Sequence, residues 1–133
     1  MNNDSIGNSG IDNKGILRWL RAFWEFSRPH TIVGTSLSVL ALYAIAQSEK
    51  LFVIPVVLPL SFAWLACICG NIYIVGLNQL EDVEIDKINK PYLPVASGEF
   101  SRKTGELIVA LTGILAVFTA VSQGQFLLAT VGV

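Results

Sequence analysis

The longest uncharged segment of the chain, residues 51–80, constrains the fold more than any other feature. It contains no Asp, Glu, Lys or Arg, and about 20 apolar residues are enough for a helix to cross the hydrocarbon core of a bilayer. Residues 31–46 are also uncharged, and Glu106 is the only charge in residues 106–122. We therefore predict three complete membrane spans. These lie at about residues 30–47, 51–80 and 105–122.

A further apolar segment, residues 126–133, follows the third predicted span. It is less than half a crossing long, because a span needs about 20 residues. Of the whole chain, 53% is apolar and only 14% is charged, whereas about 25% of a soluble domain is charged. The expected fold class is all-α: a polytopic transmembrane helical bundle with three full spans plus the start of a fourth. The chain reads as truncated within this fourth segment.

The N-terminal residues 1–15 are rich in Asn, Ser, Asp and Gly and are expected to form a disordered tail. Residues 16–133 are then a single membrane domain. At its beginning, residues 16–27 alternate aliphatic and aromatic side chains with Arg18, Arg21 and Glu25 at helical spacing. This pattern is typical of a short helix that lies in the lipid headgroup layer. Residues 1–30 contain no apolar segment of the kind found in signal peptides, so we expect no cleavable signal before the first predicted span.

The net charge of −1 comes from nine basic and ten acidic residues, without the basic stripe that nucleic-acid binding requires. We expect no nucleic-acid partner, and the sequence does not indicate a protein partner. Cys67 and Cys69 lie within an apolar segment without the further His or Cys of a zinc site. They are interpreted as small packing residues.

The placement of basic residues predicts the orientation of the chain in the membrane. Four Lys and Arg residues precede the first span, four lie between the second and third, and only Lys50 lies in the loop between the first and second. Basic residues concentrate on the cytoplasmic side of membrane proteins. The N-terminus and residues 81–103 are therefore expected to face the cytoplasm or the plastid stroma.

An acidic stretch directly follows the second span. If the helix continues past Asn78, about 100° per residue places Asn78, Asp82 and Asp86 on one face, with Glu84 on another. Carboxylates one helical turn apart repel each other, and a bound cation relieves that repulsion. Oxygen ligands of this kind suit Mg²⁺, which usually binds one or two carboxylates together with substrate phosphates.

Basic residues near this stretch extend the hypothesis. Lys87 and Lys90 could hold a diphosphate, and Arg28 could contact a phosphate or an anionic acceptor. The alternative is a solvated helix end, with Arg28 as an interfacial anchor and His30 as an interfacial polar residue. Ser101 or Thr104 could begin the third span.

Asn78, Asp82 and Asp86, followed by "KINKPYLPVASGEFS", resemble the first aspartate-rich motif of the UbiA family of intramembrane prenyltransferases. "FSRPHTIVGTSLSV" is similar to the first helix of that family. Gln79 stands where many members have Asp. Members are bundles of about nine helices with a second aspartate-rich motif, and nothing after Phe100 supplies one here.

The resemblance implies a Mg²⁺-dependent prenyl transfer from a polyprenyl diphosphate to an aromatic acid, with Asp82 and Asp86 as catalytic metal ligands, assisted by Asn78. It is strongest to the homogentisate prenyltransferases of tocopherol and prenylquinone synthesis, with phytyl diphosphate as donor. Such a protein would lie in a cyanobacterial-type or plastid membrane.

Several alternatives stay open at this point. The donor could be solanesyl or geranylgeranyl diphosphate, and the reaction could be that of a 4-hydroxybenzoate prenyltransferase or a chlorophyll synthase. A non-catalytic membrane fragment is the alternative from another class. Three spans cannot enclose a long prenyl chain, so we expect the chain alone to be inactive.

Overall fold

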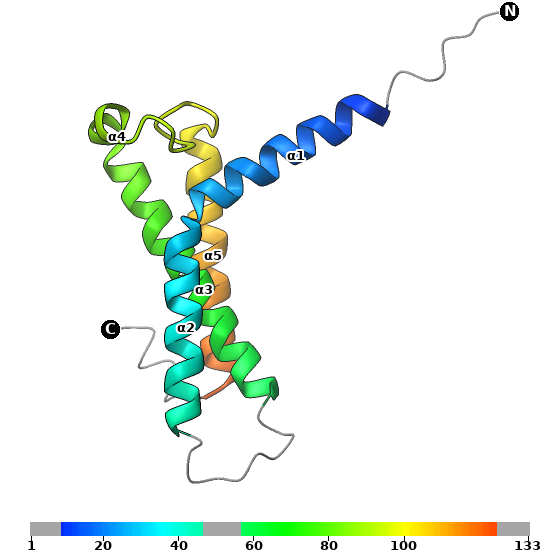
Figure 1. The fold of residues 1–133 in the computed structure, drawn as a ribbon, viewed down its shortest axis with the longest axis vertical. Coiled ribbons are helices and arrows are strands. Elements are labelled where there is room, and N and C mark those ends of the chain that lie inside the picture. Colours follow the sequence, from blue (N-terminus) through cyan, green and yellow to red (C-terminus); the bar gives the residue numbers. More distant parts are fainter. Residues whose placement is uncertain (1–8, 47–56, 125–133) are drawn as a thin grey trace, which may run out of the picture.

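The computed structural model describes residues 9–46 and 57–124, and within these ranges the chain is helical without strands (Figure 1). The all-α prediction is confirmed. The helices, in chain order, are α1 (Ser9–Phe26), α2 (Pro29–Ala46), α3 (Val57–Glu81), α4 (Val83–Asn89) and α5 (Arg102–Ser122).

Three of the helices are long and apolar enough to cross a membrane. By length and composition they are Pro29–Ala46, Leu58–Glu81 and Arg102–Ser122, which confirms the three predicted spans of an integral membrane protein. The predicted start of a fourth span, residues 126–133, lies outside the described residues, as do residues 51–56 of the second.

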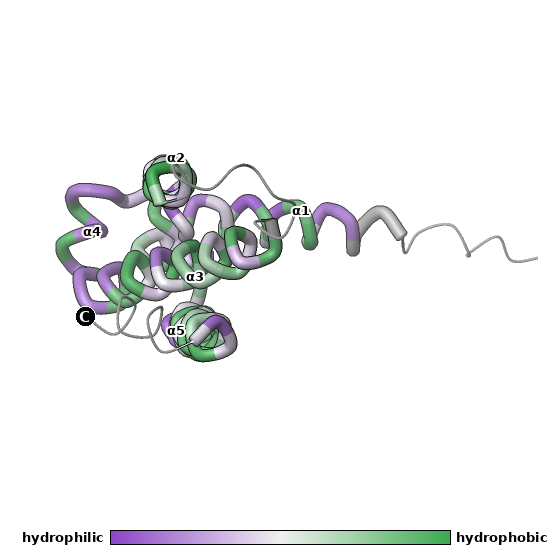
Figure 2. Tube along the Cα trace, turned by 90° about the horizontal axis from the view of Figure 1, so that it is seen from below, coloured by the Kyte–Doolittle hydropathy of each residue, from purple (hydrophilic) through white to green (hydrophobic). Residues whose placement is uncertain are grey.

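The spanning helices are arranged around α3, which lies between α2 and α5 when the bundle is viewed along its length (Figure 2). Small residues allow α3 and α5 to pack closely. A Cβ atom on Gly76 would lie 2.7 Å from Val109, and one on Gly113 would lie 2.8 Å from Tyr73. The close contact between these helices therefore requires glycine at both positions.

Helix α2 is attached to α3 by polar side chains, because α2 has no buried residue. The Trp64 indole donates a hydrogen bond of 2.9 Å to the Ser36 hydroxyl, and the Asn71 amide donates one of 3.0 Å to Thr31. Ile32 and Val39 are half-buried, whereas Val33, Leu37, Leu40, Leu42 and Ile45 are exposed, as expected for a helix in lipid.

Two local sequence signals begin the spanning helices. Pro29 is the first residue of α2, a position where a missing backbone N–H is tolerated. Ser101 caps α5 by accepting a hydrogen bond of 3.1 Å from the backbone N–H of Thr104, so Ser101 is the predicted helix start that the structure uses.

The N-terminal helix begins earlier than the sequence indicated. Residues 1–15 were expected to be disordered, whereas α1 starts at Ser9, and residues 1–8 lie outside the described part of the chain. The helical register of the amphipathic segment continues into the polar residues before Gly15. Helix α1 leaves the bundle at the same end as α4 (Figure 1).

The main hydrophobic cluster lies where α1, α3, α5 and the loop before α5 meet. Its buried members are Ala22, Phe26, Ile72, Leu80, Val95, Phe100, Ile108 and Val109. This cluster holds the polar end of the bundle in place, and that end carries the acidic stretch.

Candidate functional site

The acidic stretch does not form one continuous straight helix. Helix α3 ends at Glu81, Asp82 adopts φ −95° and ψ 21°, and α4 begins at Val83. The Asp82 N–H still donates to the Asn78 carbonyl at 2.9 Å, and the Asp86 N–H donates to the Asp82 carbonyl at 2.8 Å. The backbone therefore keeps helical hydrogen bonds while α4 takes a new direction (Figure 1).

This break separates the environments of the three predicted metal ligands. Asn78 and Asp82 are exposed, whereas Asp86 is 3% exposed. The straight-helix geometry that placed all three on one face does not hold across Asp82, because its dihedral angles turn the chain. Asp82 and Asp86 nevertheless remain neighbours, because the Asp86 N–H bonds to the Asp82 carbonyl.

The buried carboxylate of Asp86 is paired with Lys90. The Lys90 ammonium donates a hydrogen bond of 3.2 Å to Oδ1 of Asp86, and the Lys90 backbone N–H donates to the Asp86 carbonyl at 2.7 Å. A buried charge requires such a partner.

The two lysines predicted to hold a diphosphate line different hollows. Lys90 lines a hollow of about 250 Å³, together with Arg28, His30, Tyr92 and three others. Arg28 reaches it from the link between α1 and α2, where its φ of 50° lies in the left-handed region. The fold thus brings Arg28 and Lys90, which are far apart in the sequence, to one site beside Asp86.

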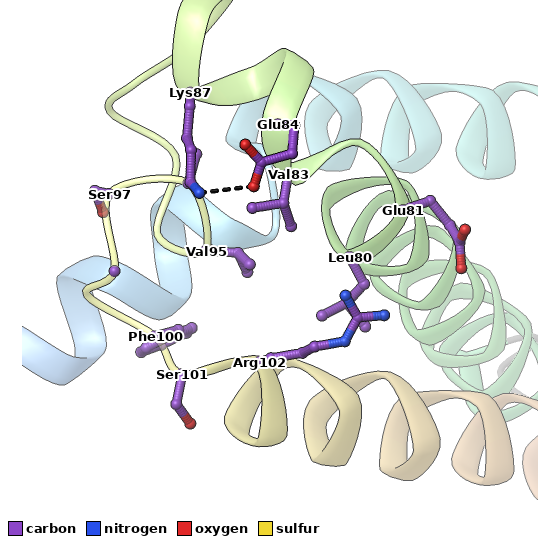
Figure 3. Close-up of a pocket in the computed structure, with 12 residues that line it drawn as sticks. Leu80, Glu81, Val83, Glu84, Lys87, Val95, Ser97, Phe100, Ser101 and Arg102 are labelled. Carbon is purple, nitrogen blue, oxygen red and sulfur yellow. Dashed lines mark hydrogen bonds and ion pairs between the residues drawn. The ribbon is translucent and has the colours of Figure 1, made fainter.

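Lys87 lines a second, larger hollow of about 510 Å³ between the end of α3, α4 and the loop before α5 (Figure 3). Its ammonium donates a hydrogen bond of 2.7 Å to Glu84, and both side chains are exposed. Arg102, also in this hollow, pairs with Glu106 at 3.0 Å. Lys87 and Arg102 each pair with an exposed acid. The hollow at Arg28 also holds paired groups, because Lys90 pairs with Asp86 and Glu25 lines it, but it brings Arg28 and Lys90 together.

Gln79 is a residue whose structural role the sequence did not predict. It is 1% exposed, and its Nε2 donates a hydrogen bond of 2.7 Å to the carbonyl of Phe26. Phe26 ends α1, so this carbonyl lacks the partner that a helix interior would provide. Oε1 of Gln79 is buried without a hydrogen-bond partner among the described residues. Only the tertiary contact between α3 and the α1–α2 link identifies this role.

The donor set of the acidic stretch fits a Mg²⁺ ion that shares its coordination with a substrate. Asp82 makes no side-chain cap hydrogen bond, and in the described ranges the buried Asp86 carboxylate pairs with Lys90 through Oδ1. In the described ranges, no three His, Cys, Asp or Glu side chains gather as a complete metal site. In magnesium–phosphate sites the protein usually contributes one or two carboxylates, and the substrate phosphates and water supply the other ligands. Asp82 and Asp86 match that number.

Comparisons with known proteins identify the family of this chain. Residues 33–133 match the UbiA prenyltransferase family. The chain is 53% identical to homogentisate phytyltransferase of Synechocystis sp. over 117 residues, which are 86% of this chain and 38% of that protein.

Plant relatives give the same result. The identity is 53% over 97 residues to homogentisate phytyltransferase 1 of Arabidopsis thaliana, covering 72% of this chain and 25% of the relative. It is 48% over 107 residues to homogentisate solanesyltransferase of the same plant, which covers 77% of this chain and 28% of that relative. The chain thus spans about a quarter to two fifths of these relatives' length. No solved structure matches it. The matched region, with the acidic stretch at its centre, shows that this chain belongs to the UbiA prenyltransferase family.

Proposed function

We propose that this chain forms the N-terminal part of a prenyltransferase that transfers a prenyl group from a polyprenyl diphosphate to homogentisate, with phytyl diphosphate as the preferred donor. The observation that carries the proposal is that Lys90, which pairs with the buried Asp86 at 3.2 Å, lines the same hollow as Arg28. A carboxylate suited to a metal and two cations suited to a phosphate thereby adjoin one another.

The reaction breaks the C–O bond of the donor, and the diphosphate leaves with both electrons. A carbon of the electron-rich acceptor ring forms the new C–C bond and loses its proton, while the acceptor's carboxylate leaves as carbon dioxide and a proton replaces it. When bound, Mg²⁺ would neutralise charge that develops on the departing diphosphate. Asp82 and Asp86 would hold this ion, and Asn78 is a further candidate ligand one turn earlier on α3.

The basic side chains of the site would bind the diphosphate or the acceptor's carboxylate. The Lys90 ammonium is within reach of Asp86 at 3.2 Å and is itself half-exposed, so it can turn toward a phosphate when a metal neutralises the carboxylate. Arg28 can present a planar pair of N–H donors to a phosphate or to the acceptor's carboxylate. Lys87, paired with Glu84 on the other side of α4, would supply a weaker positive field at the mouth of the site.

The relatives support homogentisate as the acceptor, because the proteins compared are named for phytyl and solanesyl transfer to it. They support the donor less strongly, since the same similarity extends to a homogentisate geranylgeranyltransferase of Hordeum vulgare at 44% identity. The length of the bound prenyl chain depends on the cavity between the spanning helices. We propose a multi-pass protein whose N-terminus and residues 81–103 face the cytoplasm or stroma, in a cyanobacterial-type or plastid membrane.

The test uses membranes of cells that express the complete open reading frame in which this chain is encoded. Labelled homogentisate is supplied with phytyl, geranylgeranyl or solanesyl diphosphate, and 4-hydroxybenzoate replaces homogentisate in a parallel assay. We expect the highest rate with phytyl diphosphate and homogentisate, complete loss on chelation of divalent ions, and recovery with Mg²⁺. Transfer that survives chelation, or that prefers 4-hydroxybenzoate, would contradict the proposal.

A non-catalytic role is the alternative for the 133-residue chain by itself. It is favoured by the number of membrane spans, because three helices of the described ranges are long and apolar enough to cross a membrane. The same assay with the 133-residue chain alone distinguishes the two possibilities. We expect this chain to be inactive, because three spans leave the prenyl chain uncovered.

A further inference from the structure

Helix α1 presents three different sectors around its circumference. At about 100° per residue, Ile16, Leu20 and Trp24 lie within about 80° of one another, with Leu17 beside them. These four side chains are 50–65% exposed. The chain therefore displays a row of large apolar groups outside its membrane-spanning helices.

The second sector is charged and borders the apolar row. Lys14, Arg18, Arg21 and Glu25 fall within about 60° of one another on the same helical projection. Arg21 pairs with Glu25 at 3.2 Å. The sector carries three basic groups and one acid, which complements phosphate groups at a lipid surface.

The third sector packs against the protein. Ala22 and Phe26 are buried in the main hydrophobic cluster. Trp19 lies 5.5 Å from Phe23 and 6.0 Å from Phe100 between ring centroids. Arg18 reaches Glu99 in the same loop at 3.4 Å. Because this side of α1 is attached to the loop before α5, the direction of the exposed apolar row is determined by the fold.

The placement of α1 agrees with a bilayer surface. It leaves the bundle at the end that carries α4 and the polar loop, and runs away from the spanning helices instead of alongside them (Figure 1). A helix of this kind cannot be a fourth member of the bundle over its described length. Trp and Arg side chains are each favoured where one end of the group meets hydrocarbon and the other meets water.

We infer that α1 docks on the lipid bilayer, with Ile16, Leu17, Leu20 and Trp24 inserted at the boundary between headgroups and acyl chains. Its packed sector, which lies beside this apolar row, holds the loop of Glu99 and Phe100 near that surface. This inference does not depend on the proposed activity, because it concerns only the contact of α1 with lipid. The apolar row of α1 is proposed to contact the bilayer, not a soluble protein or another segment of the chain.

The three tryptophans provide an internal test. Trp24 lies in the exposed row of α1 and Trp64 in the spanning helix α3. Trp19 contacts Phe23 and Phe100 and is 48% exposed. The 133-residue chain is reconstituted into phosphatidylcholine vesicles as W19F/W64F, which retains only Trp24, and as W19F/W24F, which retains only Trp64. The lipids carry bromine either close to the ester group or close to the end of the acyl chain.

We expect bromine near the ester group to quench Trp24 more than bromine near the chain end does, and aqueous iodide to quench it little. Trp64 should show the opposite order of the two lipids, which verifies that the bundle is inserted. Three results would overturn the inference: iodide quenching of Trp24 without bromine quenching, protection of Trp24 from both quenchers, or stronger quenching near the chain end.

A matched pair of substitutions locates the effect on the apolar row. In the protein that retains only Trp24, Leu20→Asp introduces a charge next to Trp24, and we expect loss of bromine quenching and a gain of iodide quenching. Lys14→Gln changes the charged sector and should leave quenching in these neutral vesicles unchanged. Equal responses of both variants, or no response to Leu20→Asp, would contradict docking through this row.

Discussion

The side-chain amide of Gln79 donates a hydrogen bond of 2.7 Å to the backbone carbonyl of Phe26. It thereby joins α3, immediately before the acidic stretch, to the end of α1, where the chain turns through Arg28 into α2. Both partners are fully buried. One hydrogen bond consequently connects the part of the chain that carries the carboxylates with the part that carries Arg28.

Replacing Gln79 with Leu should destabilise this end of the protein. The Phe26 carbonyl would be left buried without a donor, at a cost of about 1–3 kcal/mol. Thermal unfolding of the purified chain in detergent measures the effect. Asn78→Leu, one residue earlier and exposed, serves as the control and should change the midpoint little. Equal midpoints for both variants would contradict the assigned hydrogen bond.

Gly76→Ala should also destabilise the bundle. The new methyl group would lie 2.7 Å from both the Phe26 ring and Val109, and overpacking of this kind costs about 1–3 kcal/mol. Gly70→Ala, on the same helix but with nothing within 4 Å of its Cβ position, should be neutral or slightly stabilising. The comparison of the two unfolding midpoints in detergent checks the packing of α3 against Phe26 and α5.

Asp82→Ala and Asp86→Asn should each abolish prenyl transfer. The substitutions are made in the protein encoded by the complete open reading frame, and transfer is assayed in membranes of the expressing cells. Loss of a group that stabilises developing charge lowers the rate by about 10²-fold or more. Glu84→Ala should have a mild effect, because Glu84 is exposed and pairs only with Lys87 in the described structure. Rates are measured with phytyl diphosphate and homogentisate at equal protein level. An equal loss at all three positions would show that general acidity, not two specific carboxylates, supports the reaction.

Lys90→Met should weaken binding of the diphosphate donor more than Lys87→Met does. Lys90 lines the hollow that also contains Arg28, whereas Lys87 lies in the separate hollow beside Glu84. We expect the KM for the donor to rise with Lys90→Met, together with a fall in kcat if Asp86 loses its orientation. A larger rise in KM with Lys87→Met would assign the diphosphate to the hollow in Figure 3.

Much of the architecture could be predicted because it depends on short-range properties of the chain. Uncharged length identified the three spans, Ser101 was one of the two candidate starts of the third, and the tail of the acidic motif supported the family. Lipid solvates apolar helices of about 20 residues whatever their neighbours are. The start of α1 at Ser9 was not predicted, because its polar first turns lack an apolar periodicity.

The sequence by itself determined that the chain is helical, that it enters a membrane and that its acids gather where α3 ends. Only the tertiary structure decided that the helix breaks at Asp82, that Asp86 is buried against Lys90, and that Gln79 supports Phe26. The physical reason is the range of the interactions. Burial in lipid and helix capping act within a few turns, whereas the environment of a single carboxylate or amide is set by segments that meet only after the bundle has formed.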